Sequence, residues 1–352
     1  MSTTTIPTDA LSWMPTPTAG PVFIVSMRRG GSSLLYALLN KHPQVALMYE
    51  ADLLLLRASF SRPGRYKDWR ERWPFWSDSL SRHGLDGADF SSDLNNSRDA
   101  FIAVHREYAA RRGAVIWGDK SPNYYDRLVA LAEEFYGARF IVVWRDPLAT
   151  ANATERAARA GSPYFAKKGT KLSSLLGHKK FKRQCDELRR RGRAVYEVNY
   201  EDLVQDPCST MISVCQFLQI PYLDELSNLE GADRSSIPPG AHHTFLRGSV
   251  IVSEERQQLL DLAFRAKVTR YVNLWHSQYA GLWPPRPKPS DDAPEVPGIF
   301  ERSVDKVCYT ALSAVESLKR WAFCFVPLSW LRWRRNIAIR KHTQQRTEAG
   351  VV

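Results

Sequence analysis

The sequence predicts an α/β fold in which a central parallel sheet is flanked by helices. Short apolar segments rich in β-branched and aromatic residues alternate along the chain with segments of helical character, and this alternation indicates parallel strands joined by right-handed crossovers. Charged turns follow three of the predicted strands, at residues 28–33, 118–122 and 145–147. Because ligands bind beyond the carboxyl ends of the strands in such sheets, these turns support the fold and predict a site at that edge.

Each predicted strand is a run of apolar residues. The first reads PVFIV and leads through a turn into the helical run LLYALL, and the clearest later strand reads RFIVVW. We predict strands at 21–27, 44–48, 114–117, 139–144 and 195–198. We predict helices at 32–40, 51–61, 97–112, 124–135, 148–160, 171–191, 208–218, 253–278 and 301–323.

The chain has 352 residues, enough for one large domain with appendages or for two domains. We expect a flexible tail rich in Thr and Pro over residues 1–20 and the main domain over 21–280. Residues 281–300 contain six prolines, which favour a linker. Helical spacing returns after it, so we predict a basic helical C-terminal extension over 301–352.

Positive charge is concentrated in two blocks of a chain whose net charge is +12. Residues 159–193 hold 12 Lys and Arg against two acids, and residues 301–352 hold 10 against four. Such blocks are either solvated faces or attract a polyanion, an anionic acceptor or a membrane surface. The apolar part of residues 324–335, CFVPLSWLRWRR, is far shorter than the ~20 residues of a spanning helix. Interfacial membrane contact and packing on the main domain stay open as alternatives.

The cysteine count and the N-terminus bear on compartment and cofactors. Five cysteines without a CxxC pair argue against a disulfide framework or a zinc site. The first 20 residues have neither a basic start nor an apolar core, so they are unlike a secretory signal. We therefore expect a cytoplasmic protein. His242 and His243 lack partners at metal-ligand spacing, so we assign no metal. We expect no nucleic-acid partner, and the sequence does not indicate an oligomeric state.

The turn after the first strand has the composition of an anion site. A strand that feeds a glycine turn and a helix N-terminus points backbone N–H groups and the positive end of the helix dipole at a ligand. Ser32 and Ser33 add hydroxyl donors and Arg29 adds a guanidinium. The turn lacks the GK[ST] of an ATP or GTP loop, and it lacks the GxGxxG of a dinucleotide site. The sequence thus predicts a phosphate or sulfate group held at the end of the first strand.

These residues resemble a known family. Arg29-Gly30-Gly31-Ser32-Ser33-Leu34-Leu35 is similar to the R-[SG]-G-[ST]-[ST]-x-L loop of sulfotransferases that use 3′-phosphoadenosine 5′-phosphosulfate, or PAPS. His42-Pro43-Gln44-Val45 and Glu50 are close to the tyrosylprotein sulfotransferases and related bacterial proteins. The resemblance covers about residues 21–275, so it makes 21–280 a sulfotransferase domain. It implies a P-loop-like three-layer sandwich in which Arg29, Gly30, Gly31, Ser32, Ser33 and Leu34 bind the 5′-phosphosulfate.

The same resemblance implies roles for three charged residues at strand ends. Glu50 matches the proposed general base, although a carboxylate that only stabilises a helix N-terminus is a close alternative. Lys120, in GDKSP, matches a Lys that stabilises the transferring sulfonate together with Arg29, although a surface Lys before a Ser-Pro turn is the simpler alternative. Arg145, in RDP, matches the Arg that binds the 3′-phosphate. The family has a Ser eight residues later, and this chain departs from it with Ala153.

Two further donor contacts follow from the resemblance. Tyr200, in NYEDL, resembles a Tyr that lies near the donor, and Arg247, in HHTFLRGSV, is a candidate for a loop that closes over the nucleotide. His42 is an alternative base, but HPQV favours a turn residue. Asn152 or Thr154 is a candidate to replace the missing Ser.

The sequence therefore predicts a PAPS-dependent sulfotransferase of the EC 2.8.2 type, with no metal requirement. The acceptor would be a hydroxylated small molecule, carbohydrate or lipid, and the basic 159–193 block either favours an anionic one or is simply a charged helix face. One alternative is an ATP-dependent, P-loop kinase-like phosphotransferase, which a magnesium requirement would favour. Another is a non-enzymatic basic protein that binds anions or, through residues 301–352, a membrane surface.

Overall fold

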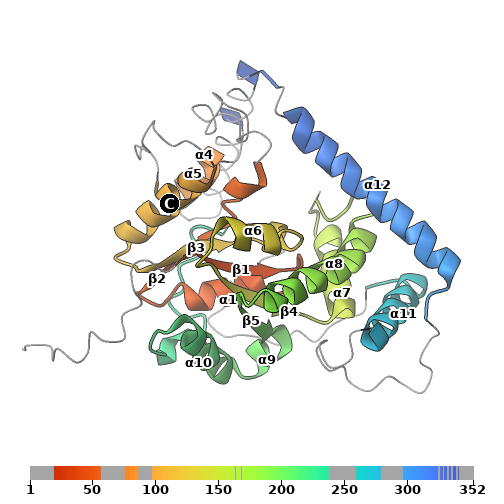
Figure 1. Ribbon diagram of the computed structural model, residues 1–352, viewed down its shortest axis with the longest axis horizontal. Helices are drawn as coiled ribbons and strands as arrows, with labels where there is room; N and C mark the ends of the chain where they lie inside the picture. The colour runs from red at the N-terminus through yellow and green to blue at the C-terminus, as the bar shows by residue number, and fades with distance from the viewer. Residues whose placement is uncertain are drawn as a thin grey trace, which may run out of the picture.

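The structure is a computed structural model, and it describes residues 20–56, 76–85, 97–162, 164–167, 169–237, 259–278, 296–323 and isolated positions from 326 to 340. Its centre is a five-stranded sheet in which every pair of neighbouring strands is parallel. The order across the sheet is β2-β3-β1-β4-β5 (Figure 1). The strands are β1 (Val22–Ser26), β2 (Val45–Tyr49), β3 (Ile116–Lys120), β4 (Arg139–Trp144) and β5 (Ala194–Asn199).

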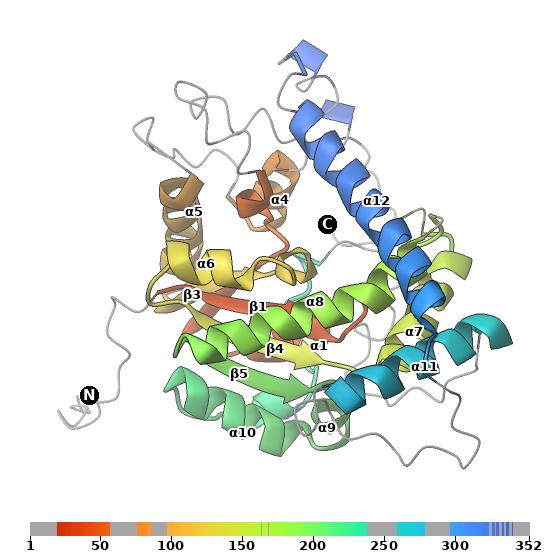
Figure 2. The ribbon, with the colours of Figure 1, turned by 45° about the vertical axis from the view of Figure 1, so that its right-hand side comes forward.

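Helices cover both faces of the sheet (Figure 2). Phe23 and Val25 of β1 face the core shared with α5, α6 and α8, whereas Val22 and Ile24 face the core shared with α1, α9 and α10. Successive side chains of a strand point to opposite faces, so a strand buried on both sides reads as a continuous apolar run. The predicted three-layer α/β sandwich is therefore confirmed. The helices are α1 (Ser32–Leu39), α4 (Trp76–Arg82), α5 (Ser97–Arg111), α6 (Leu128–Glu134), α7 (Pro147–Arg159), α8 (Thr170–Arg190), α9 (Tyr200–Gln205), α10 (Pro207–Leu218), α11 (Leu262–Gln278) and α12 (Ile299–Phe323).

Side-chain caps begin two helices at the carboxyl edge of the sheet, α7 and α9. The Asp146 carboxylate accepts the N–H of Ala149 at 2.7 Å, and Pro147 takes the first helical position of α7. Asn199 Oδ1 accepts the N–H of Glu201 at 3.1 Å and begins α9 directly after β5. These short connections fix the residues that follow β4 and β5 at the carboxyl edge of the sheet.

The third strand differs from its prediction. It was expected at 114–117, but β3 begins at Ile116 and continues to Lys120, because Gly118 and Lys120 pair in register with Val22 and Ile24 of β1. Gly118 has φ +153, and a Cβ there would lie 1.9 Å from the Val22 carbonyl oxygen. Only glycine permits this close approach. The longer strand carries Lys120 to the end of the sheet as a buried strand residue.

Some predicted helices are shorter than expected. The 51–61 segment has a short 3₁₀ helix at Leu53–Leu56, residues 51–52 before it are not helical, and 57–61 lie outside the described residues. The 124–135 segment forms a 3₁₀ turn at Pro122–Tyr124 before α6, where Ser121 Oγ accepts the Asn123 N–H. A further short 3₁₀ helix occupies Asp224–Ser227.

The C-terminal helix α12 packs back on the main domain through one face. Its Asp305 carboxylate accepts hydrogen bonds from Lys267 Nζ at 2.8 Å and from the Tyr271 hydroxyl at 3.0 Å, both on α11. Arg270 Nη2 lies 2.8 Å from Glu301. In the part of the chain that the structure describes, no helix is both long enough and apolar enough to cross a membrane. The 1–19 tail and 279–295, most of the predicted linker, lie outside the described residues.

Candidate active site

The glycine turn between β1 and α1 is held by short-range contacts. The Gly30 N–H donates to the Met27 carbonyl at 2.8 Å, and Ser26 Oγ lies 2.8 Å from Ser32 Oγ. Gly31 is the N-cap of α1 with φ +97, and a Cβ there would lie 2.1 Å from the Tyr200 ring. No side chain caps α1 at this residue. The first N–H groups of the helix therefore remain for a ligand, as an anion site requires.

Backbone strain gathers around the site. Four described non-glycine residues have a positive φ: Arg29 (66°), Glu50 (49°), Asp52 (54°) and Gln219 (59°). Gln219 ends α10. The other three follow β1 or β2 at the carboxyl edge of the sheet. Such conformations cost of order 1–3 kcal/mol each and cluster at functional sites.

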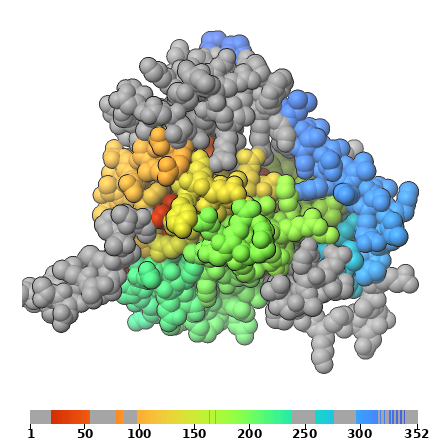
Figure 3. All heavy atoms as spheres, in the orientation of Figure 1, coloured from red at the N-terminus to blue at the C-terminus, as the bar shows by residue number. Residues whose placement is uncertain are grey.

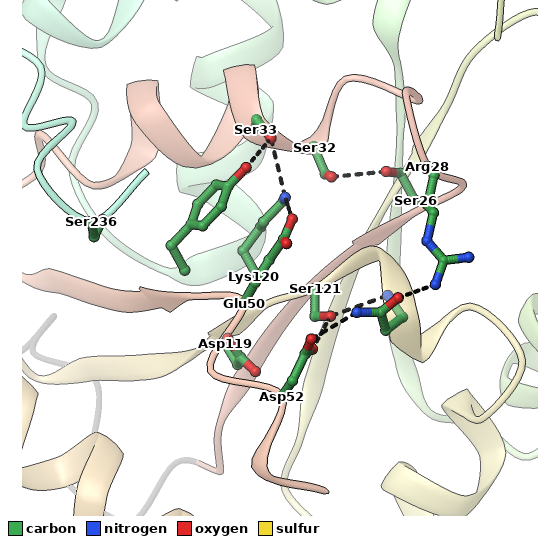
Figure 4. A network of polar contacts seen from close by, with 12 residues as sticks. Ser26, Arg28, Ser32, Ser33, Glu50, Asp52, Asp119, Lys120, Ser121 and Ser236 are labelled. Atoms are coloured by element: carbon green, nitrogen blue, oxygen red, sulfur yellow. Dashed lines mark hydrogen bonds and ion pairs between the residues drawn. The ribbon is translucent and has the colours of Figure 1, made fainter. Parts of the chain in front are cut away.

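The structure brings Lys120, Glu50 and Ser33 together from three elements (Figure 4). Lys120 Nζ lies 2.6 Å from Glu50 Oε1 and donates to Ser33 Oγ at 3.1 Å. Ser33 Oγ is 2.8 Å from the Tyr49 hydroxyl, and Lys120 Nζ lies 4.1 Å from the centre of the Tyr49 ring. Parallel pairing of β2 with β3 sets Tyr49 beside Lys120. A cation, a carboxylate and a hydroxyl thus meet next to the anion-binding turn.

The ion pair controls the protonation of both partners. The Lys120 side chain is 2% exposed and that of Glu50 is 32% exposed. Burial by itself raises the pKa of Glu50, but the Lys120 ammonium outweighs it and holds that pKa below the ordinary value. Burial likewise opposes the charge of Lys120, and the Glu50 carboxylate more than offsets it, so the pKa of Lys120 is raised. At neutral pH the pair is therefore a carboxylate and an ammonium.

A second network adjoins the pair (Figure 4). The Asp52 carboxylate accepts hydrogen bonds from Ser121 Oγ and, at 2.7 Å, from Asn123 Nδ2. The Arg28 guanidinium donates to Asn123 Oδ1. These contacts link the glycine turn, the end of β2 and the turn after β3. Arg28 therefore points toward the turn after β3, although it is its neighbour Arg29 that carries the sequence motif.

The neighbouring Asp119 has no cation at hydrogen-bond distance among the described residues. Its carboxylate accepts the Tyr124 hydroxyl at 2.7 Å and the Ala51 N–H at 3.3 Å. Burial, followed by the charge of Asp52, raises the pKa of Asp119 to about 7. Burial and then Glu50 also raise the pKa of Asp52. Asp119 lies on the face of β3 turned away from α1, so it supports the turn rather than the anion site.

Arg145 and Tyr200 form the other end of the site. Arg145 Nη1 donates to the Arg29 carbonyl at 2.9 Å, and its guanidinium carbon lies 4.2 Å from the centre of the Tyr200 ring. Both side chains are buried. The Tyr200 ring lies against Gly31, so the stacked pair borders the glycine turn. The structure thus brings Arg29, Arg145 and Tyr200 together around one loop.

The missing Ser leaves an apolar position on α7. Ala153 is buried, and the two candidates beside it are engaged elsewhere. Asn152 Oδ1 accepts the N–H of Leu259 at 2.8 Å, and the Thr154 hydroxyl donates to the Thr150 carbonyl at 2.9 Å. Neither contact holds the side chain toward Arg145. The Arg145 end of the site therefore has one hydroxyl fewer than the sequence pattern of the family.

Other candidates lie away from this cluster. His42 is buried at the far end of α1, where Nε2 lies 3.0 Å from the Pro221 carbonyl and Nδ1 accepts the Gln44 N–H. That position is a turn remote from Lys120. Arg247 lies outside the described residues. Over the ranges that the structure describes, no three His, Cys, Asp or Glu side chains are grouped as a metal site would require.

A cavity of about 340 Å³ opens beside the glycine turn. The turn after β3, the segment that precedes α8 and the inner side of α12 form its walls, and Thr154 reaches it from α7. Tyr164 stacks on Arg28 with 4.9 Å between the guanidinium carbon and the ring centre. One acid, Asp126, faces four cations in the lining: Arg28, Arg127, Lys167 and Lys180.

Part of this arrangement has no clear signature in the sequence. Asp52, Asn123 and Arg28 join the site through contacts between distant segments, and no local pattern indicates them. A weak signal existed for Asp52, which follows Glu50 by two residues at a strand end. The cavity wall from α12 could not be anticipated, because the sequence left its packing open.

The comparison with known protein families agrees with the geometry. A sequence profile of the sulfotransferase family matches residues 21–225, more than half of the chain. The chain therefore belongs to the sulfotransferase family, and its class of chemistry is the transfer of a sulfonate group. The family resemblance predicted from the glycine turn is thus confirmed.

Several solved structures are similar to this one. The sulfotransferase domain from the olefin synthase of Synechococcus PCC 7002 is 20% identical with a TM-score of 0.49, covering 70% of this chain and 92% of that domain. The sulfotransferase domain from the curacin biosynthetic pathway is 21% identical with a TM-score of 0.48, covering 73% and 97%. Sulfotransferase STF9 from Mycobacterium avium is 15% identical with a TM-score of 0.41, covering 77% and 80%. A search of curated protein sequences gives no match.

Proposed function

We propose that this protein transfers the sulfonate group of PAPS to a hydroxyl group of an acceptor and releases 3′,5′-adenosine bisphosphate. The observation that carries the proposal is the ion pair of buried Lys120 with half-buried Glu50 at the mouth of an uncapped glycine turn. The turn suits the 5′-phosphosulfate, because backbone N–H groups and Arg29 can surround its oxygens. Arg145 suits the 3′-phosphate, and the Tyr200 ring offers a surface near the nucleotide.

The proposed reaction is a single in-line displacement. Glu50 takes the proton of the acceptor hydroxyl, and the acceptor oxygen forms a bond to sulfur while the bond between sulfur and the 5′-phosphate oxygen breaks. The electron pair of that bond stays on the phosphate, which leaves as part of the bisphosphate. Lys120, Ser33 and Arg29 stabilise the charge that grows on the bridging oxygen. Removing one such donor typically costs about 10²–10³ in rate.

The donor would also switch Glu50 into a stronger base. Without donor, Lys120 holds the pKa of Glu50 down. A bound phosphosulfate competes with Glu50 for the Lys120 ammonium, which already reaches Ser33 of the turn. Once that ammonium turns to the donor, burial dominates at Glu50 and raises its pKa. The base therefore gains proton affinity only when there is a sulfonate to transfer.

The cavity beside Arg28 is the proposed acceptor site. Its lining includes Asn123, which donates to Asp52, two residues after Glu50, and it has an excess of cations. Such a lining favours a hydroxylated acceptor that also carries a carboxylate, phosphate or sulfate. An acceptor screen that scores release of the bisphosphate, with each phenol or sugar tested as an acid and as its neutral amide or ester, will show lower KM for the acids. A consistently lower KM for the neutral amides and esters would contradict this assignment of the acceptor site.

Ligand-dependent thermal stability tests the donor without an identified acceptor. A ligand that binds only the folded state at about a hundred times its Kd stabilises it by ~2.7 kcal/mol. We expect 3′,5′-adenosine bisphosphate to raise the melting temperature, and ATP with magnesium to have little effect. Arg145→Met should abolish the shift. Arg139→Met is the matched control, because Arg139 begins the same strand and donates to the Leu218 carbonyl at the opposite edge. A shift with Mg-ATP alone would identify a phosphotransferase instead.

A further inference from the structure

The outward face of α12 is apolar and exposed. Phe300 is 83% exposed, Val307 is 69% exposed and Leu318 is 61% exposed. These residues belong to a stripe that recurs every three or four positions along the helix, the spacing of one helical face. The stripe consists of Phe300, Val304, Val307, Ala311, Ala314, Val315, Leu318 and Ala322. Figures 1 and 2 show α12 along the outside of the molecule, and it reaches the surface in Figure 3.

The helix buries its charged face instead. Asp305 is 4% exposed and bonds to Lys267 and Tyr271, and Glu301 pairs with Arg270. This arrangement is the reverse of an ordinary surface helix, which turns its apolar stripe to the core. The ion pairs fix the rotation of α12, so the apolar stripe is held outward. Contiguous exposed apolar surface of this kind marks an interaction site.

Cations gather on the side of α12 that faces α8. Arg302 and Lys306 of α12 lie near Lys179 and Arg183 of α8, and after burial these three neighbouring charges lower the pKa of Lys179. The same helix is followed by Trp330 and Trp333, whose side chains are 41% and 60% exposed and whose ring centres are 6.4 Å apart. Arg332, Arg334 and Arg335 adjoin them in the sequence. Trp with Arg and Lys around an apolar helical face suits a bilayer interface.

We propose that the α12 stripe docks the protein on the surface of an anionic lipid bilayer. The stripe enters the headgroup boundary, and the cations on the polar side of the helix contact anionic headgroups. A second copy of the chain fits less well, because the positions that flank the stripe carry Ser303, Cys308 and Thr310 rather than the charges that pair helices in a coiled coil. Leu312, Ser313 and Val315, the last at the edge of the stripe, line the 340 Å³ cavity, so docking would bring that cavity close to the bilayer.

Vesicle flotation with the full chain tests how much the apolar stripe contributes to bilayer binding. We expect the protein to float with vesicles made of phosphatidylcholine mixed with phosphatidylglycerol. With vesicles of phosphatidylcholine alone it should remain unbound at the bottom of the gradient. Val307→Ser with Leu318→Ser should weaken partition by at least about tenfold, since each loses a large apolar contact. The matched control is Val115→Ser with Tyr136→Ser, which removes two exposed apolar side chains elsewhere on the surface and should leave partition unchanged. Far-UV circular dichroism verifies that both proteins are folded.

The charge contribution has a separate test. Arg183→Gln with Lys306→Gln should reduce partition to the anionic vesicles by about fivefold for each cation, and high salt should do the same. Absence of flotation with the anionic vesicles, or equal flotation of the stripe variant and its control, would overturn the proposal. A wild-type dimer that the stripe variant converts to a monomer, without vesicle binding, would assign the stripe to a second copy. None of these readouts depends on sulfonate transfer.

Discussion

Glu50 is a half-buried carboxylate and Asp119 a fully buried one on neighbouring strand ends, and their surroundings drive their pKa values in opposite directions. Lys120 lies 2.6 Å from Glu50 and holds its pKa below the ordinary value. Asp119 has only Tyr124 and backbone donors at hydrogen-bond distance among the described residues, with Asp52 near by, and its pKa is raised to about 7. Burial acts on both, and the nearest charge decides the outcome.

In the proposed mechanism, this difference separates a reacting group from a supporting one. Glu50 is ionised at neutral pH and borders the anion site, so it can accept a proton from an acceptor. Asp119 points to the other face of β3, where its bonds to Tyr124 and Ala51 hold the turn that presents Lys120. An acidic residue at a strand end is therefore not evidence of catalysis until its cation partner is known.

Replacing Glu50 should give the largest effect on transfer. Glu50→Gln keeps the size of the side chain and removes the base, which typically contributes about 10²–10⁴ in rate. Asp52→Asn, in the adjoining network, should cost less than tenfold, since an amide still bonds to Ser121 or Asn123. Turnover is measured as release of 3′,5′-adenosine bisphosphate with the acceptor found in the screen. Equal losses in the two variants would remove Glu50 from its assigned role.

Replacing Lys120 should have the next largest effect. Lys120→Met retains apolar bulk but loses the charge that we propose stabilises the bridging oxygen, and we expect kcat to fall about 10²–10³-fold. Lys182 is the matched control, because it is equally buried and pairs with Asp186 on α8, away from the site. Lys182→Met should lower the melting temperature with kcat per folded molecule unchanged. Loss of kcat in both variants would make the Lys120 effect merely structural.

The smallest expected effect is a pH dependence of stability. The folded-state pKa of Asp119, about 7, lies above its ordinary value of 3.8, so the folded protein binds the extra proton between these values. That contribution is complete below the unfolded pKa and is lost as pH rises through about 7. Urea unfolding at acidic and alkaline pH should show a loss of stability in wild type that is smaller in Asp119→Asn. Parallel curves for the two proteins would show that Asp119 titrates normally.

Much of the fold was readable from the sequence because local patterns determine it. Buried parallel strands read as apolar runs, and caps such as Asp146-Pro147 mark helix starts. The third strand was predicted too short, because Gly118, Asp119 and Lys120 resemble a turn locally. Their pairing with β1 and β2 overrides that preference, and this pairing is a contact between distant segments.

The site was readable only where a motif carries it. The glycine turn predicted the anion site, and the family resemblance placed Glu50, Lys120 and Arg145 around it. Asp52, Asn123 and Arg28 were not predicted, because their hydrogen bonds depend on how three loops meet. The outward stripe of α12 was also missed, since periodicity shows that a helix has an apolar face but not which way that face turns.

The central claim is that a bound donor draws the Lys120 ammonium away from Glu50. The most direct test is the number of protons that the protein takes up when a ligand fills the donor site. Titration calorimetry with 3′,5′-adenosine bisphosphate in buffers of different ionisation enthalpy measures this uptake, and Glu50→Gln supplies the background from the ligand itself. The account predicts that at about pH 5, near the ordinary carboxyl range, wild type takes up more protons than Glu50→Gln. Equal uptake in the two proteins would show that the pair stays closed and would contradict the account.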